Sequence, residues 1–338
     1  METILVPYTT DITLLSVLKL VVALVAIILL LIANSVVMVY LERKVAGFVQ
    51  RRPGPYEVGP WGILQTVADT VKLLGKQILI PGNSDRFLFL LAPVLSMFPM
   101  FLMFLVIPYG PILTGLEVNL GLLLILAFAG MEGLAVIAGG WASNNKYSLI
   151  GAARAVSQSV AYEIPLILAI LALAFQHGSL DLSVLNRAQE GWIWNWNIFT
   201  QPLAFLIFVI TCFGETNRAP FDLPEGESEL TGGYHTEYSG MGFALFFMAE
   251  YTSMMLVSFL AAVLFLGGSN APVDIPLING VWWTLIKMGA FMTFMIWVRW
   301  TFPRVRFDQL LNINWKWLLP LGLLNLWVTA LVMKVVGN

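Results

Sequence analysis

The segment from Glu215 to Tyr238 concentrates the groups of this chain that could exchange protons. Six of the 20 acidic residues lie in these 24 residues, and Arg218 is the only lysine or arginine among them. Carboxylates held close together repel one another, so some of them bind protons more readily than a solvated acid does. We therefore expect the segment to handle protons or a polar substrate. The acids are Glu215, Asp222, Glu225, Glu227, Glu229 and Glu237.

The rest of the chain predicts the elements that must hold this segment. It is 59% hydrophobic and 11% charged, with a mean hydropathy of +0.82, which is far outside the range of soluble proteins. Apolar runs long enough to cross a hydrocarbon core of roughly 30 Å recur along it. We expect an all-α polytopic membrane protein with one membrane domain over residues 1–338. The eight predicted spans are 12–41, 88–108, 119–141, 155–176, 199–214, 241–267, 281–302 and 316–336.

Only two polar stretches, 42–87 and 215–240, could form structure outside the membrane. Within the first, the spacing predicts a helix over 61–80 with a polar stripe from Gln65 to Lys76 and an apolar opposite face. Such a helix can lie in the membrane interface. The pattern is equally compatible with a covering helix docked on the bundle.

Basic residues predict the orientation of the spans. The odd-numbered loops and the residues beside them contain 14 of the 18 lysines and arginines. The positive-inside rule then places those loops in the cytoplasm or its equivalent and both termini on the outer side. The acidic segment lies on the inner side with the basic residues, so the two sets of charges can meet.

Three further carboxylates, Glu132, Glu163 and Glu250, fall inside predicted spans. A charged carboxylate near the bilayer centre costs roughly 2.5–3.5 kcal/mol, and Lys287 is the only base well inside a span. We expect these acids to line a hydrated interior or to stay protonated, and either state suits proton exchange. The alternative is that each one binds a neighbouring hydroxyl or carbonyl and only packs. Three such acids beside an acidic loop favour function.

The chain is poor in metal ligands. A single cysteine, Cys212, excludes a disulfide framework and a centre with several thiolates. With only His177 and His235, we do not expect a zinc or haem site built by this chain alone.

Five motifs stand out between residue 41 and residue 251. They are Leu41-Glu-Arg-Lys44, Gln50-Arg-Arg-Pro-Gly-Pro55, Ala142-Ser-Asn-Asn-Lys-Tyr-Ser-Leu149, Gly214-Glu-Thr-Asn-Arg-Ala-Pro-Phe-Asp-Leu-Pro-Glu-Gly-Glu-Ser-Glu-Leu230 and Ala244-Leu-Phe-Phe-Met-Ala-Glu-Tyr251. Together they resemble one family, the quinone-site membrane subunit of respiratory complex I, also known as NADH dehydrogenase subunit 1 or the H subunit of the bacterial NADH:quinone oxidoreductase. The resemblance runs from about residue 40 to the C-terminus, and its longest motif, over 214–230, is highly specific.

The resemblance implies a subunit of a proton-translocating NADH:quinone reductase in the bacterial inner membrane. Loops 42–87 and 215–240 would form the quinone tunnel and the contact with the peripheral arm. Quinone, either ubiquinone or menaquinone, would be the substrate, and this chain would bind no metal or flavin. Its partners would be the iron–sulfur, quinone-site and antiporter-like subunits. Tunnel and interface residues would be Glu42, Arg43, Arg52, Asp69, Arg218, Asp222, Glu225, Glu227 and Glu229, and proton-coupling residues Glu132, Glu163, Glu215 and Glu250.

One motif departs from the family pattern, because Arg51 precedes Arg52 where one arginine is usual. Three alternatives remain on the sequence alone: the related subunit of a membrane-bound hydrogenase or ferredoxin-dependent complex, a stand-alone ion transporter, and a structural anchor. A transporter would favour inverted repeats and broken helices at matching positions, which the sequence does not show.

Overall fold

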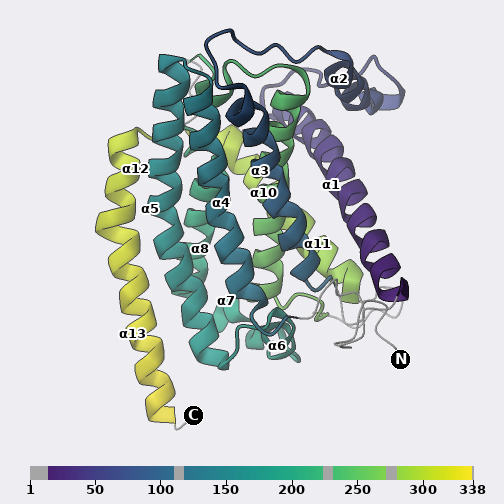
Figure 1. The fold of residues 1–338 in the computed structure, drawn as a ribbon. Coiled ribbons are helices and arrows are strands. Elements are labelled where there is room, and N and C mark those ends of the chain that lie inside the picture. Colours follow the sequence, from purple (N-terminus) through teal and green to yellow (C-terminus); the bar gives the residue numbers. More distant parts are fainter. Residues whose placement is uncertain (1–13, 110–117, 224–230, 272–279, 337–338) are drawn as a thin grey trace.

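The computed structural model describes residues 14–109, 118–223, 231–271 and 280–336, and every regular element in these ranges is a helix. Long helices stand side by side as a bundle (Figure 1). Seven helices in the described ranges are long and apolar enough to cross a membrane, which confirms the polytopic all-α prediction. They are α1 (Leu14–Val49), α3 (Arg86–Val106), α4 (Gly121–Ala142), α5 (Lys146–His177), α10 (Gly240–Phe265), α11 (Gly280–Thr301) and the continuous pair α12 (Phe307–Ile313) and α13 (Leu319–Val336).

The fifth predicted span is shorter than the others. Helix α8 (Pro202–Glu215) has 14 residues, or about 21 Å at the rise of an α-helix, which is less than a bilayer core. Proline at its first position has no N–H to lose, so the chain starts a new helix there after the short α7 (Asn197–Thr200). Beyond α8 the chain stays buried in the bundle as an irregular turn over 216–223. The sequence predicted the apolar segment but not this break.

Helix α10 forms the centre of the bundle. It packs against α1, α3, α8 and α11, and almost all of its residues after Phe246 are buried. Its serine and threonine hydroxyls donate to carbonyls of the same helix, as Ser258 does to Met254 at 2.7 Å, so burying them costs little free energy. Glu250 and Tyr251 therefore lie in the interior rather than toward lipid.

The predicted amphipathic helix is α2 (Leu64–Gly75), which is shorter than 61–80 at both ends. Trp61 has φ 55°, a left-handed conformation that a regular helix cannot contain, and Lys76 is extended. The helix lies across one end of the bundle (Figure 1). Its apolar residues Leu64, Val71 and Leu74 are 50–62% exposed. Thr66, Thr70 and Leu73 of the same helix line a cavity with α1 and α10, against which α2 packs. The helix is therefore docked on the bundle and also keeps an apolar face that the described part of the chain does not cover, so both interpretations remain open.

The described chain begins in α1 and finishes in α13 at the end of the bundle opposite α2 (Figure 1). The short helices α6 (Leu182–Arg187) and α7 lie at that same end. The loops at the α2 end carry most of the charged residues described below.

Candidate functional site

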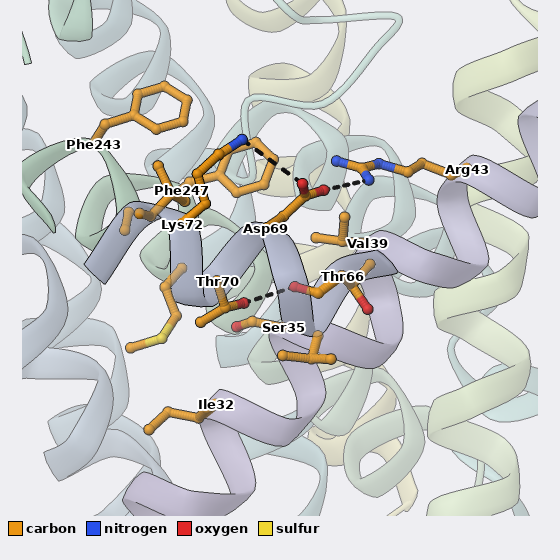
Figure 2. A pocket seen from close by; sticks show the side chains of 14 residues that line it. Ile32, Ser35, Val39, Arg43, Thr66, Asp69, Thr70, Lys72, Phe243 and Phe247 are labelled. Atoms are coloured by element: carbon orange, nitrogen blue, oxygen red, sulfur yellow. Dashed lines mark hydrogen bonds and ion pairs between the residues drawn. The ribbon is translucent and has the colours of Figure 1, made fainter. Parts of the chain in front are cut away.

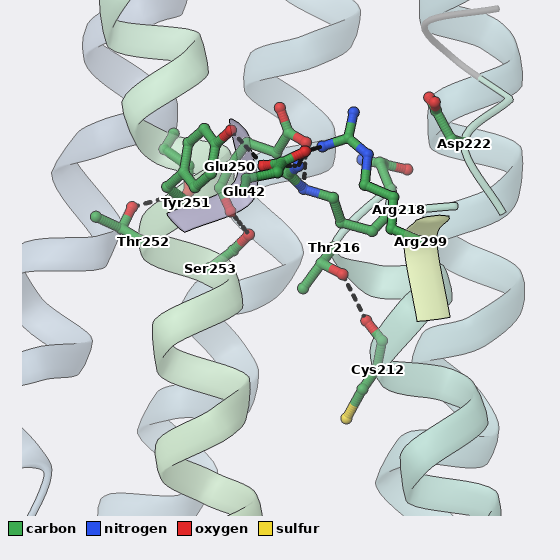
Figure 3. Close-up of polar contacts among 12 residues, drawn as sticks. Glu42, Cys212, Thr216, Arg218, Asp222, Glu250, Tyr251, Thr252, Ser253 and Arg299 are labelled. Carbon is green, nitrogen blue, oxygen red and sulfur yellow. Dashed lines mark hydrogen bonds and ion pairs between the residues drawn. The ribbon is translucent and has the colours of Figure 1, made fainter. Parts of the chain in front are cut away.

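Arg218 lies in the turn after α8 and joins three distant parts of the chain. Its Nη1 lies 3.0 Å from Glu42 Oε2 of α1, and its Nε lies 2.7 Å from Glu250 Oε1 of α10. The guanidinium also lies over the Tyr251 ring, 4.3 Å from the centroid. Figure 3 shows these side chains converging between the helices. Burial opposes the charged form of Arg218, but Glu250 and Glu42 outweigh it and hold its pKa well above the usual range.

Two more groups bind Glu42 in this cluster. The Tyr251 hydroxyl donates to Glu42 Oε2 at 2.6 Å, and Arg299, in the last turn of α11, donates to Oε1. Glu42, Arg218 and Glu250 are each at most 8% exposed, so the charges are compensated by one another rather than by solvent. We call Glu42, Arg218, Glu250, Tyr251 and Arg299 the inner charge cluster.

A short turn places Arg218 there. The Thr216 N–H and hydroxyl both donate to the Cys212 carbonyl, and Arg218 N donates to the Phe213 carbonyl at 3.2 Å, which reverses the chain at the end of α8. Asn217 has φ 50°, a conformation that asparagine tolerates better than most residues. The reversal directs Arg218 back toward α1 and α10 (Figure 3).

The inner charge cluster borders a cavity of about 230 Å³. The side chains around it are mostly charged or aromatic, and they include Arg52, whose Nε donates to Gln50 at 2.6 Å. The lining residues are Val39, Glu42, Arg43, Ala46, Arg52, Arg218, Phe247, Glu250, Tyr251, Arg299 and Trp300.

A second cavity, of about 350 Å³, lies between α1, α2 and α10 (Figure 2). Its walls are largely apolar, with Ile32, Thr70 and Phe243 among them. At its rim Asp69 accepts from Arg43 at 2.6 Å and lies 3.7 Å from Lys72. Burial works against the charge of Asp69, but its hydrogen bond and charge interaction with Arg43 outweigh it and lower its pKa.

The two cavities share part of their walls. Val39, Arg43 and Phe247 line both, so the apolar cavity beside α2 adjoins the charged one beside Arg218. A molecule with an apolar tail and a polar head would meet matching surfaces in that order.

Three other predicted carboxylates form a separate group on α4, α5 and α8. Glu215 is 8% exposed, and its charge interacts with those of Glu132 and Glu163. The Glu163 carboxylate lies against Gly130 of α4, where a Cβ would be 3.2 Å from Oε1. In the described part of the chain none of the three forms an ion pair, and Glu215 Oε2 has no hydrogen-bond partner. Glu250 differs from them because Arg218 supplies the cation that the spans lack.

Asp222 is held at the base of the acidic loop. It is 4% exposed and accepts from Arg304 at 2.7 Å, and Val305 N donates to the Pro220 carbonyl at 3.1 Å. The connection after α11 is thereby tied to the turn after α8. Glu225, Glu227 and Glu229 lie outside the described residues.

Lys287, the base expected inside a span, lies at the opposite end of the bundle from the inner charge cluster. Its Nζ donates to the carbonyls of Gly268 and Asn270 at 2.9 and 2.7 Å and lies 4.2 Å from the centroid of the Trp196 ring. We call this arrangement the outer carbonyl cage.

Comparison with known proteins decides the family. Residues 21–330 match the family described as NADH dehydrogenase. The chain is 48% identical over 311 residues to the H subunit of NADH-quinone oxidoreductase from Desulfotalea psychrophila, covering 89% of this chain and 93% of that one. It is 47% identical over 325 residues to the same subunit from Carboxydothermus hydrogenoformans, covering 96% and 91%. This chain belongs to the NADH dehydrogenase family of membrane subunits. It is a multi-pass subunit of NADH-quinone oxidoreductase, which confirms the resemblance and makes other complex I subunits its partners.

Membership of this family favours the interpretation of the chain as a complex I subunit. It argues against the three alternatives left by the sequence, which are a hydrogenase or ferredoxin-dependent subunit, a stand-alone transporter and a structural anchor. In the described ranges of this NADH dehydrogenase family member, no three histidine, cysteine or acidic residues lie close enough to hold a metal.

Sequence reasoning gave no role to Tyr251, Arg299 or Arg304. Tyr251 follows Glu250 directly, and adjacent residues of an α-helix project about 100° apart, so the sequence gives no sign that both contact Arg218. Arg299 and Arg304 counted only toward the topology, although an arginine in the last turn of a span is positioned to meet an acid at the end of another span. The partner of each could not be predicted without knowing which helices are neighbours.

Proposed function

We propose that this chain forms the membrane part of the quinone-access tunnel of NADH-quinone oxidoreductase, and that its buried carboxylates couple quinone reduction to proton pumping. The observation that carries the proposal is the pair of adjoining cavities with the shared wall of Val39, Arg43 and Phe247. A quinone has an apolar isoprenoid tail and a polar headgroup. The apolar cavity would take the tail, and the head would pass toward the inner charge cluster.

The loops at the α2 end would meet the peripheral arm. Arg51, Arg52, Tyr56 and Glu57 are exposed there, and Arg52 also lines the charged cavity. Electrons would reach the quinone from that arm, where the resemblance places the iron–sulfur subunits. NADH would be the donor, as the names of the relatives state for their own complexes.

The proton-coupling role follows from the two groups of acids. Quinone reduction takes up two electrons and two protons, which changes the charge beside Arg218. Glu215 lies three residues before Arg218, and its charge interacts with those of Glu132 and Glu163. These carboxylates have no cation to fix their charge in the described ranges, so they can pass a change of protonation from the turn across α5 to α4.

The tunnel is tested by narrowing the shared wall. Val39→Trp should lower donor:quinone turnover of the assembled complex at least tenfold, while reduction of ferricyanide by the donor survives. Val37→Trp is the matched control, because Val37 lies on the same helix with its side chain 52% exposed. Unchanged quinone turnover in Val39→Trp, or equal loss in both variants, would contradict the tunnel.

The coupling role is tested at Glu163. Glu163→Gln removes the titration and nearly preserves the shape, so it should lower both quinone turnover and proton uptake in proteoliposomes, and Glu163→Asp should retain part of both. Glu190→Gln, at an exposed acid of the opposite end, is the control. Full turnover with a normal proton-to-electron ratio in assembled Glu163→Gln would leave Glu163 with a packing role only.

The orientation is part of the proposal. With basic loops inside, both termini and Glu190 face the outer side of the bacterial inner membrane. In a Cys212→Ser background, Glu190→Cys should react with an impermeant maleimide in right-side-out vesicles and stay unlabelled in inverted ones. Labelling only in inverted vesicles would reverse the topology.

A further inference from the structure

One side chain of α5 holds the turn that carries the inner charge cluster's arginine. Gln158 is fully buried, and its Nε2 lies 2.9 Å from the Gly214 carbonyl, 3.1 Å from Asn217 Oδ1 and 2.7 Å from the Phe221 carbonyl. Two of the three partners are backbone carbonyls, which can only accept, so they fix the amide with its nitrogen toward the turn. The same contacts span eight residues of the chain with one amide group.

The residue that follows each of these three acceptors belongs to one of the charged groups described above. Glu215, Arg218 and Asp222 alternate with Gly214, Asn217 and Phe221 along the turn, and they point to other partners. The turn's own bonds, such as Phe221 N to the Arg218 carbonyl at 2.9 Å, shape it locally but do not attach it to a spanning helix.

Few other contacts attach the 214–221 turn to α5. The Tyr162 ring, one helical turn along α5, packs against Gly214, where a Cβ would be 2.4 Å from the ring. Its hydroxyl has no hydrogen-bond partner among the described residues, so this contact fixes a distance but no direction. Gln158 is therefore the directional attachment of the turn to α5.

The left-handed residue of the turn needs such an attachment. Asn217, at φ 50°, holds a backbone conformation that persists only where its surroundings stabilise it. Gln158 binds its side-chain oxygen and the carbonyls on either side of it in sequence.

We infer that Gln158 is a positioning residue, which fixes the 214–221 turn on α5 so that Arg218 reaches Glu42 and Glu250 at the wall of the charged cavity. Five residues further along the same helix is Glu163, so one rigid element holds both the arginine turn and a carboxylate of the second group. The functional consequence rests on the proposed quinone tunnel. A displaced Arg218 changes the wall of the charged cavity, and this affects quinone binding only if quinone enters that cavity.

The test is Gln158→Met, which keeps the length of the side chain and removes its donors. In the assembled complex the quinone KM should rise roughly tenfold, equivalent to about 1.4 kcal/mol, with a smaller fall in kcat. Ferricyanide reduction should be unchanged. Gln176→Met is the matched control, because Gln176 lies on the same helix and makes one hydrogen bond, at 3.3 Å to Thr200, at the opposite end.

A milder variant keeps the inference testable if Gln158→Met fails to assemble. Asn217→Gly removes one of the three acceptors, tolerates the left-handed conformation and keeps both backbone acceptors. It should raise the quinone KM about two- to threefold. An unchanged KM in either assembled variant, or an equal rise in Gln176→Met, would overturn the positioning role.

Arg218→Lys in the same assay separates this inference from the proposed function. A raised quinone KM in Arg218→Lys with an unchanged KM in Gln158→Met would reject the role of Gln158 alone. An unchanged KM in both would reject the use of the charged cavity by quinone as well.

Discussion

Arg218 and Lys287 are two cations buried in the same bundle, and they are neutralised in different ways. Arg218 lies between two carboxylates with the Tyr251 ring over its guanidinium. Lys287 lies among backbone carbonyls with the Trp196 ring over its ammonium. Both have an aromatic face at just over 4 Å, so the difference is in the anions.

The difference separates a responsive site from a fixed one. A carboxylate can gain a proton and lose its charge, whereas a carbonyl keeps the same dipole at any pH. The carbonyls around Lys287 also follow the C-terminal end of α10, where the helix dipole favours a cation. The inner charge cluster can therefore take part in a reaction that changes charge, and the outer carbonyl cage is suited to fixing α11 on α10.

The strongest way to break this comparison is to remove the inner cation. Arg218→Leu leaves Glu42 and Glu250 buried with less compensation, which should cost about 3–5 kcal/mol and abolish quinone turnover. Loss of this chain from the complex on native gels would measure the first effect, and donor:quinone assays the second. Arg218→Lys, which keeps the charge, should assemble. If Arg218→Leu assembled with normal turnover, the inner charge cluster would have no more functional weight than the outer cage.

Removing the outer cation should have a smaller effect of a different kind. Lys287→Met takes the donor from two buried carbonyls, which should lower the stability of the complex by about 1–3 kcal/mol. The quinone KM and kcat of the assembled complex should stay at their original values. Thermal inactivation and quinone titration measure the two quantities, and a raised quinone KM would show that the cage also serves the inner site.

Acidification extends the comparison to a third base, the half-buried His235, which lies outside the spans. Burial lowers the pKa of His235 to about 4, below its value of roughly 6.5 in an unfolded chain. Between these values the unfolded chain binds the proton and the folded one does not, so stability falls as pH drops from about 6.5 toward 4. From pH 7 to pH 5 the loss should be about 2 kcal/mol.

His235→Gln should remove that part of the acid sensitivity. Thermal inactivation of the original complex and the variant at pH 7 and pH 5 measures it. Equal acid sensitivity in both proteins would assign the effect to other groups.

The smallest expected effect on stability belongs to the half-exposed pair at the rim of the apolar cavity. Asp69→Asn weakens the contact with Arg43 and should change stability by less than about 1 kcal/mol. Its effect on quinone turnover should be larger than its effect on stability, because Asp69 and Arg43 both line the cavity. The pKa of Asp69 is lowered, so the pair is ionised above about pH 4, and its small contribution is lost only as pH falls below that value. Equal loss of quinone and ferricyanide activity in Asp69→Asn would indicate failed assembly instead.

The sequence predicted the helical elements well because their signal is local. Eight apolar segments correspond to the seven long helices and to α8, and one amphipathic segment corresponds to α2. The ends of α2 could not be predicted in the same way. Trp61 and Lys76 lie outside the helix because of their backbone conformations, which the spacing of apolar residues does not indicate. The break before α8 depends on Pro202, which is compatible with both a helix start and a longer span.

The residues of the site could be selected from the sequence, but their pairing could not. Glu42 and Arg218 are separated by 176 residues, and their contact depends on α1 and α8 both packing against α10. Glu250 was grouped with the acids that lack a cation, because Arg218 was counted with the acidic loop rather than with the spans. Composition gives the number of charges, whereas three-dimensional packing decides which ones compensate each other.

The outward apolar face of α2 leaves part of this helix to be covered by its surroundings. Thr66, Asp69, Thr70 and Leu73 line the apolar cavity beside α1 and α10, whereas Leu64, Val67, Val71 and Leu74 are 44–62% exposed. These exposed side chains need an apolar neighbour, which acyl chains, detergent tails or another subunit can supply. In the proposed tunnel, the width of the apolar cavity would depend on that neighbour as well as on the sequence. A short-chain detergent, a thicker bilayer and a native lipid mixture would then give quinone entrances of different width.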